Sequence, residues 1–237
     1  MKISSPIYQL KRRAKLQSRG KKLKLNEALD QIAFEEGFQS WSHLAHTYSK
    51  ATPAKTVLRQ MKSGDMVIIA ARPGQGKTLL GLELAALAAG IGRAAYVFTL
   101  EYSEKAVWDQ LRQLGLTAAE QISTITVDTS DDICASYIAN RVADGAEKSV
   151  VVIDYLQVLD QKRSSPPLKE QVRELRKFAT ETGSILIITS QIDRSFDATV
   201  NCLPSIDDIR LPNHADLSSF DMRCFLQDGE IHIDTPV

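Results

Sequence analysis

Apolar and polar positions follow two patterns along the chain, one typical of buried strands and one typical of amphipathic helices. Near-continuous apolar runs predict strands at residues 67–71, 96–101, 122–127, 150–154 and 185–191. Helical spacing fills the stretches between these runs. Because strands of this kind are buried on both faces, their alternation with helices predicts an α/β domain with a mainly parallel central sheet covered by helices.

Capping residues mark the beginnings of several predicted helices. Ser103 and Ser130 stand just before two of them, and Pro167 opens a third that ends at Gly183. Near the end of the chain, residues 222–227 and 230–234 flank a two-residue Asp-Gly turn suited to positive φ. This pattern predicts a C-terminal β-hairpin.

The first fifty residues follow the pattern of short helices. Apolar side chains recur at helical spacing at Leu25, Ala28, Leu29, Ile32 and Ala33. Gly37 is placed to close this helix and Ser40 to cap the next, with Phe38 and Trp41 holding the pair together. Residues 51–55 contain Pro53 and predict a linker. We therefore expect a basic helical segment at residues 1–50 and an α/β domain at residues 51–237.

The charge of the chain is balanced overall but uneven along its length. There are 29 basic and 29 acidic residues, yet residues 1–24 contain no acid. Their basic residues are Lys2, Lys11, Arg12, Arg13, Lys15, Arg19, Lys21, Lys22 and Lys24. This segment is either an arm that binds a polyanion such as DNA or a solvated helix face.

Cysteine and histidine usage predicts no metal site and no disulfide framework. Cys134, Cys202 and Cys224 are far apart and odd in number, so we expect reduced packing residues. The four histidines have no metal-ligand spacing and are expected to be surface or packing residues: His43, His46, His214 and His232. No apolar stretch has the length of a membrane span, and no signal-peptide core follows the basic start. A soluble, cytoplasmic protein is expected.

The most informative motif lies between the first predicted strand and the helical pattern that begins at Leu79. It reads Ala71-Arg72-Pro73-Gly74-Gln75-Gly76-Lys77-Thr78, a phosphate-binding loop with alanine in place of the usual first glycine. The backbone N–H groups of such a loop surround phosphates at the positive end of a helix dipole. Lys77 is expected to reach the β- and γ-phosphates and Thr78 to bind Mg²⁺. The alternative is a glycine-rich turn without a ligand.

Polar side chains end three other predicted strands, at the edge where open α/β sheets bind ligands. Asp154 has the position of a Walker B carboxylate, which holds Mg²⁺, usually through water. From Glu101 a carboxylate can deprotonate an attacking water, although complementation of a helix dipole is an alternative. An amide at Gln191 could bind the γ-phosphate and transmit its loss to the following loop.

These segments resemble the ATPase domain of DnaB-type replicative helicases, which has a RecA-like P-loop NTPase fold. Residues 70–78, 98–103, 152–157 and 189–195 carry the resemblance, and it covers about residues 57–227. It implies ATP and Mg²⁺ as cofactors, with Lys77 and Thr78 in the loop and Asp154 as the Mg²⁺ carboxylate. It also implies Glu101 as the catalytic base and Gln191 as the γ-phosphate sensor.

The resemblance further implies partners. Family members form rings with nucleotide between neighbouring subunits, so a homo-oligomer, such as a hexameric ring, is expected. Their channel-facing loops hold single-stranded DNA, and the corresponding residues here are Lys162, Arg163 and Arg194. Contacts from these residues to phosphates would depend on salt. A solvated loop explains the same charges.

Two departures from the family affect the expected activity. We expect no counterpart of the family's primase-interacting domain and none of the later segment that supplies an arginine finger, with Arg210 and Arg223 as candidate replacements. We expect Mg²⁺-dependent ATP hydrolysis on single-stranded DNA in replication or a mobile element, and the expected lack of the finger argues against processive unwinding. The alternatives are a nucleotide-gated DNA- or protein-binding module with little hydrolysis and a KaiC- or RadA-like ATPase.

Overall fold

The computed structural model describes residues 3–4, 7–21, 23–49, 53–116, 118–143, 148–161, 165–196, 204–211, 213, 216–227 and 230–236. The chain divides into two compact units. One comprises Met1–Thr56 with Asp228–Glu230, and the other comprises Val57–Gln227 with Ile231–Val237. We call them the N-terminal unit and the sheet unit.

The N-terminal unit contains the helices α1 (Ile7–Lys21), α2 (Leu25–Glu35) and α3 (Trp41–Ser49). They share a small apolar core formed by Ile3, Leu10, Ala14, Ala28, Leu29, Ile32, Ala33, Phe38 and Leu44. The helical spacing predicted for α2 is confirmed, except that Leu25 at its first position is exposed.

The turn between α2 and α3 follows the sequence-based expectation. Gly37 has a φ of 82°, and Ser40 Oγ accepts a hydrogen bond from the His43 N–H at 3.1 Å. Phe38 is buried in the core, and Trp41 packs against it. The predicted caps are therefore confirmed, and Phe38 and Trp41 both contribute to the packing between the helices, as predicted.

The predicted linker at residues 51–55 is wrong in its second half. Residues 51 and 52 lie outside the described part of the chain, but Pro53 begins the helix α4 (Pro53–Gln60). Proline suits the first turn of a helix because its φ is already helical and its missing N–H needs no acceptor there. The proline therefore starts a helix instead of breaking one.

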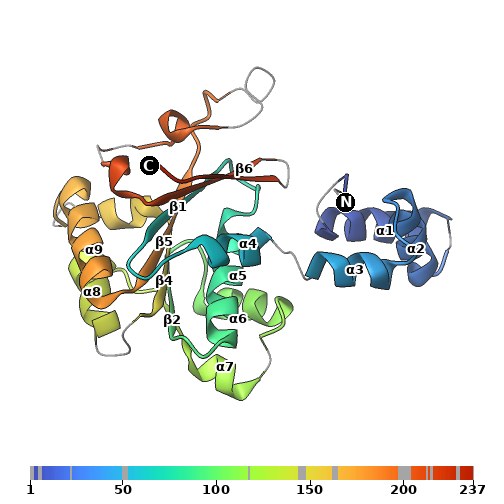
Figure 1. Cartoon of the computed structure of the whole chain (residues 1–237), viewed down its shortest axis with the longest axis horizontal. Coiled ribbons are helices and arrows are strands. Elements are labelled where there is room, and N and C mark those ends of the chain that lie inside the picture. Colours follow the sequence, from blue (N-terminus) through green and yellow to red (C-terminus); the bar gives the residue numbers. More distant parts are fainter. Residues whose placement is uncertain are drawn as a thin grey trace. The chain divides into compact units, whose positions relative to one another are not determined.

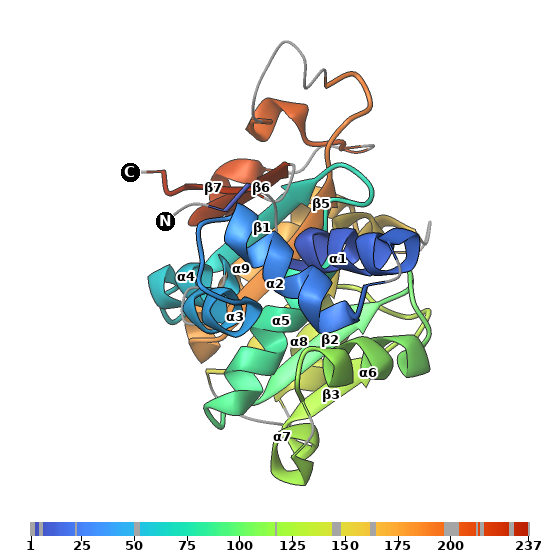
Figure 2. The same ribbon diagram turned by 90° about the vertical axis from the view of Figure 1, so that its right-hand side faces the viewer.

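The sheet unit is built on a seven-stranded, mainly parallel sheet. Its strands are β1 (Met66–Ala71), β2 (Ala95–Thr99), β3 (Ile125–Asp128), β4 (Val150–Asp154), β5 (Ile185–Gln191), β6 (Met222–Gln227) and β7 (Glu230–Asp234). Their order is β3-β2-β4-β5-β1-β6-β7, with parallel pairing from β3 through to β6. Figure 2 shows β3 and the β6–β7 pair at opposite edges. β7 must run antiparallel to β6 because two residues connect them, as the predicted hairpin requires.

Helices cover both faces of this sheet, as the near-continuous apolar strands predicted. On one face α5 (Lys77–Gly90) packs against β2 and β4, followed by α6 (Glu104–Gln113) and the short α7 (Ala119–Ser123) (Figure 1). On the other lie α8 (Ala135–Ala143) and α9 (Leu168–Thr182), over a core of buried apolar side chains. The described residues of the unit also form the short 3₁₀ helices η1 (Leu156–Asp160), η2 (Ile206–Asp208) and η3 (Leu217–Ser219).

Two predicted strands differ from the structure by more than one residue at an end. The strand predicted at residues 96–101 ends at Thr99, so Glu101 lies just beyond the edge of the sheet. The strand predicted at residues 122–127 begins at Ile125, because Ile122 belongs to α7. A short apolar run does not by itself distinguish a strand from a helix, which accounts for the second error.

The predicted cap at Ser130 is also corrected. Its Oγ accepts a hydrogen bond from the Asp132 N–H at 3.1 Å and so stabilises a turn before the helix. The helix α8 begins at Ala135, whose N–H donates to Oε1 of Gln171 on α9 at 3.0 Å. A side chain 36 residues away therefore caps this helix, which local pattern could not reveal.

No helix in the described part of the chain is long and apolar enough to cross a membrane.

Candidate functional site

The predicted phosphate-binding loop connects β1 to α5 at the carboxyl edge of the sheet. Ala71 is the last residue of β1 and is buried, and α5 begins at Lys77. Gly74 and Gly76 have φ values of 81° and 91°, which L side chains rarely adopt. The loop can turn back into the helix because these two positions are glycines.

The same glycines leave room in front of the helix. A Cβ atom added at Gly74 or Gly76 would meet no atom of the described residues within 4 Å. Packing therefore does not require glycine at either position; backbone conformation does. The first N–H groups of α5, beginning at Lys77 and Thr78, have no acceptor within the helix and end at this open space.

Lys77 lies at the centre of the site and is buried, with 7% of its surface exposed. Its Nζ lies 3.2 Å from Oε2 of Glu101 and 3.8 Å from Oδ1 of Asp154. It also lies 5.4 Å from the centre of the Tyr155 ring, close enough for a cation–π contact. Two carboxylates thus compensate this buried ammonium, as a buried charge requires.

Asp154, at the end of β4, is 1% exposed and is held by two hydroxyls. Thr78 Oγ1 lies 3.2 and 3.1 Å from its two carboxylate oxygens, and the Thr189 hydroxyl of β5 donates to Oδ1. The predicted pair of Mg²⁺ ligands, Thr78 and Asp154, is therefore in direct contact. Hydroxyl and carboxylate oxygens are the hard ligands that Mg²⁺ prefers.

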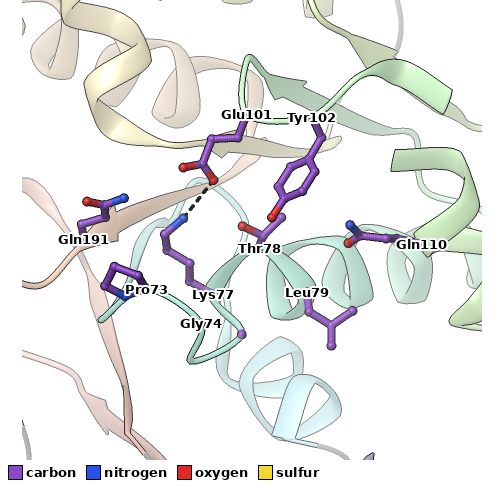
Figure 3. A pocket seen from close by; sticks show the side chains of 10 residues that line it. Pro73, Gly74, Lys77, Thr78, Leu79, Glu101, Tyr102, Gln110 and Gln191 are labelled. Carbon is purple, nitrogen blue, oxygen red and sulfur yellow. Dashed lines mark hydrogen bonds and ion pairs between the residues drawn. The ribbon is translucent and has the colours of Figure 1, made fainter. Parts of the chain in front are cut away.

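A cavity of about 310 Å³ opens over this cluster. Its lining combines predicted residues (Pro73, Gly74, Gly76, Lys77, Thr78, Glu101 and Gln191) with Leu79, Tyr102 and Gln110. Figure 3 shows Gln191 and Pro73 on one side, the Lys77–Glu101 pair in the centre, and Leu79 and Gln110 on the other side. The volume suits a small-molecule ligand.

Three residues of the cavity were missed by sequence reasoning. Leu79 and Tyr102 directly follow the motif residues Thr78 and Glu101, so adjacency was a usable signal. Both side chains are unusually exposed for apolar groups, at 40% and 38%. Gln110 lies in the middle of α6 and only the packing of that helix brings it to the cavity.

Other predicted residues lie outside the cavity lining. Arg72 and Gln75 belong to the loop but do not line the cavity, and Asp154 lies behind Thr78. Arg194 is exposed after the end of β5. Lys162 and Arg163 lie outside the described residues, so the predicted DNA-contacting loops remain predictions.

The two candidate replacements for an arginine finger differ in their surroundings. Arg223, on β6, pairs with Asp234 of β7, with Nη1 and Oδ2 3.3 Å apart. Arg210 is exposed, and its backbone N–H donates to the Gln191 carbonyl at 2.8 Å. Within the described residues, no arginine lines the cavity.

The described cysteines and histidines form no metal site. No group of three or more His, Cys, Asp or Glu side chains among the described residues could hold a metal ion. Cys134 and Cys224 are free thiols, and burial raises the pKa of Cys224 to about 12. Cys202 and His214 lie outside the described residues.

Comparison with known proteins identifies the family. The model of the DnaB-like helicase C terminal domain matches residues 54–130 and 108–223. The chain is 27% identical over 177 residues to the replicative DNA helicase DnaB of Nostoc sp., covering 62% of this chain and 20% of that protein. It is also 27% identical over 205 residues to the DnaB of Geobacillus stearothermophilus, covering 70% and 45%. A probable plasmid replicative DNA helicase of Chlamydia psittaci is 26% identical over 181 residues, covering 63% and 40%.

Solved structures show the same fold. One solved ATPase domain matches with a TM-score of 0.58 and 18% identity, covering 80% of this chain and 90% of that domain. A DnaB-like replicative helicase, solved in a study of its interactions with primase, matches with a TM-score of 0.59 and 18% identity, covering 96% and 74%. The sheet unit therefore has the RecA-like fold expected from the motifs.

The chain spans less than half the length of the curated relatives described above. The family match nevertheless extends over most of the chain and contains every residue of the cavity. It decides against the KaiC- or RadA-like alternative. The protein belongs to the family of DnaB-like helicase C-terminal domains.

Proposed function

We propose that the sheet unit binds ATP with Mg²⁺ in this cavity and hydrolyses it. The observation that carries the proposal is the meeting of Lys77, Glu101 and Gln191 around one cavity, with Asp154 directly behind Thr78. These residues come from four different strand ends and loops. Their convergence on a glycine-containing helix start is what phosphoryl transfer requires.

The loop fits a triphosphate. The open space before Gly74 and Gly76, the free N–H groups at the start of α5 and the buried Lys77 ammonium all favour a polyanion at this position. The Lys77 ammonium would leave Glu101 and bind the β- and γ-phosphates. Its burial makes this charge more effective than a surface lysine, because little water screens it.

The metal site fits Mg²⁺ by the chemistry of its donors. Thr78 Oγ1 and the carboxylate of Asp154 would hold the ion, directly and through water respectively. Bound Mg²⁺ would supply charge neutralisation for the phosphates. The Thr189 hydroxyl keeps the Asp154 carboxylate in place by donating to Oδ1.

Glu101 is the proposed general base. Its backbone N–H donates to Thr99 Oγ1 at 3.1 Å, which fixes the chain just beyond β2 and directs the carboxylate into the cavity. From there it could take a proton from water that attacks the γ-phosphate. Gln191 would hydrogen-bond the γ-phosphate from the end of β5.

The proposed substrate polymer is single-stranded DNA, bound by a homo-oligomer for which a ring of six is the assembly to test. The names of the relatives support a role in replication, either chromosomal or of a plasmid. Arg194 follows Gln191 by three residues, so a change at the γ-phosphate could reach a DNA-contacting loop through a short segment. Lys162 and Arg163 are the other proposed contacts.

A nucleotide-gated binding module with little hydrolysis is the second candidate. It is favoured by the lack of an arginine in the described cavity lining, which leaves Lys77 as the cationic side chain there. An arginine finger contributes about 10³- to 10⁵-fold in rate in related reactions. ATP would then order the loops after Asp154 and Gln191 without rapid turnover.

The test is ATP turnover with and without single-stranded DNA, with the mass of the assembly measured in Mg²⁺ and ATP. We expect DNA to stimulate turnover and Lys77→Ala to abolish it, while Lys62→Ala, an exposed lysine before β1, leaves it unchanged. Tight Mg²⁺-dependent ATP binding with negligible hydrolysis would favour the binding module. Turnover that DNA does not change in an assembled sample would count against the proposed substrate.

A further inference from the structure

The helix α1 carries a stripe of basic side chains on one exposed face. Lys11, Lys15 and Arg19 are exposed and spaced four residues apart. Each step of four residues advances about 6 Å along the helix axis and turns the side chain by only about 40°. The three charges therefore form a row on one side of α1, which we call the basic stripe.

The packing of the N-terminal unit fixes the direction of this stripe. Leu10 and Ala14 of α1 are fully buried in the unit's core. The stripe lies away from these two positions around the helix, and so faces outward from the unit. If α1 rotated so that the stripe became buried, Leu10 and Ala14 would become exposed.

The acids of residues 1–50 are engaged elsewhere. Glu27 accepts from the Lys24 N–H, and Asp30 accepts from the Trp41 N–H. Glu35 pairs with Arg13 at 3.0 Å. Glu36 accepts from the Ser4 N–H at 2.6 Å and lies 3.9 Å from Arg13. These are all four acids of residues 1–50.

The basic stripe, in contrast, has no counter-charge among the described residues. None of its three side chains forms an ion pair there, whereas the neighbouring Arg13 does. Residues 1–50 contain ten lysines and arginines against four acids, a net charge of +6, and the rest of the chain is −6. The positive charge is thus concentrated in the first fifty residues.

We propose that the N-terminal unit is a separate DNA-binding module whose basic stripe contacts the phosphates of the DNA backbone. Regularly spaced cations on a rigid helix suit a chain of regularly spaced anions. The module would hold DNA whether or not nucleotide occupies the cavity of the sheet unit. The inference goes beyond the proposed ATPase function and does not depend on it.

The stripe suits DNA better than an anionic membrane. A helix that lies in a membrane surface inserts an apolar face, but the apolar face of α1 is occupied by the unit's own core. Leu16, 60% exposed, is the one large apolar side chain of α1 that is exposed among the described side chains. A single leucine supplies little area for insertion.

The experiment measures binding of the full chain, without nucleotide, to labelled DNA over a range of salt concentrations. One variant combines Lys11→Gln, Lys15→Gln and Arg19→Gln, since glutamine keeps helix propensity and removes the charge. The matched control combines Lys62→Gln, Lys148→Gln and Lys177→Gln, three exposed lysines of the sheet unit. A charge-preserving variant combines Lys11→Arg, Lys15→Arg and Arg19→Lys.

We expect the stripe variant to bind DNA about 10-fold or more weakly at low salt, with the slope of log K against log salt reduced by about 2 to 3. The control and the charge-preserving variant should bind like the wild type. A single strand and a duplex of the same length serve as separate probes, and loss of affinity for either supports the module. Melting curves should show the stripe variant folded.

Unchanged affinity and salt slope in the stripe variant would overturn the proposal. Equal weakening by the control variant would also overturn it, because the effect would then follow total charge. A third contrary result is binding to vesicles of anionic lipid that the stripe variant loses while DNA binding stays the same. A chain that hydrolyses no ATP but loses DNA binding with the stripe would support the module and reject the ATPase proposal alone.

Discussion

The ammonium of Lys77 lies 3.2 Å from Oε2 of Glu101, so the proposed phosphate ligand and the proposed base neutralise each other. Figure 3 shows this pair spanning the centre of the cavity. A triphosphate that draws Lys77 away would leave Glu101 free to bind water. Binding of the substrate would thus activate the base. Before the substrate binds, the ion pair compensates the charges of both groups.

Replacing Glu101 by glutamine separates binding from chemistry. Glu101→Gln removes the base and the ion pair but keeps the shape, so hydrolysis should fall by about 10²- to 10⁴-fold. ATP should bind at least as tightly as in the wild type, because Lys77 no longer has to leave a carboxylate. Single-turnover hydrolysis and a binding titration measure the two effects.

Glu104→Gln is the control for this change, since Glu104 lies in the first turn of α6 and does not line the cavity. It should leave hydrolysis near the wild-type rate. Equal rates for Glu101→Gln and the wild type would remove Glu101 from the mechanism.

Tyr102 is predicted to contact the base or ribose of the nucleotide. It lines the cavity with Leu79, and both are apolar groups left exposed beside the charged cluster. Tyr102→Ala should weaken ATP binding about 5-fold or more, by loss of aromatic contact. Binding of inorganic tripolyphosphate should not change, because the phosphate loop stays intact. Calorimetric titration with both ligands measures the difference.

Tyr102→Phe keeps the ring and should bind ATP like the wild type. If Tyr102→Ala weakens both ligands equally, the residue supports the loop and makes no contact with the base. If it weakens neither, the base lies elsewhere.

Gly81 lies where α5 packs closely against β4. A Cβ atom at this position would lie 3.0 Å from Cγ1 of Val152, a branched side chain in the middle of the sheet. Gly81→Ala should lower the free energy of unfolding by about 1 kcal/mol or more, since overpacking outweighs the gain in helix propensity. Denaturant unfolding measures the change.

Gly90→Ala is the matched control in the same helix. The nearest atom to its added Cβ is Nε2 of Gln121 at 3.9 Å, an ordinary contact. This variant should be as stable as the wild type or slightly more stable. If Gly81→Ala stabilises the protein instead, the Val152 side chain can move aside at little cost in free energy.

Cys224 should be inert in the folded protein. Burial raises its pKa from 9.0 to about 12, so the reactive thiolate is scarce at neutral pH. Because the folded pKa lies above the unfolded value, the stability it contributes is present below pH 9 and is lost as pH rises toward 12. Labelling with a thiol reagent, read by peptide mass, should modify Cys134 first and Cys224 only on unfolding. Rapid labelling of native Cys224 would contradict this burial.

The local features of this protein follow from its sequence. Apolar runs and helical spacing located most strands and helices because burial imposes those periods directly. The phosphate-binding loop could be predicted because the residues it needs are close together in the chain. Gly74 and Gly76 allow its backbone conformation, and Lys77 supplies its charge. The ends of strands also predicted Glu101, Asp154 and Gln191 as site residues.

The contacts between distant segments depend on tertiary packing. The order β3-β2-β4-β5-β1-β6-β7 places the ends of β4 and β5 beside the loop, and no periodicity specifies such long-range pairing. The same holds for Gln110 in the cavity and for Gln171 as the cap of α8. Each depends on contacts between residues far apart in the chain, and those form only when the sheet and its helices pack together.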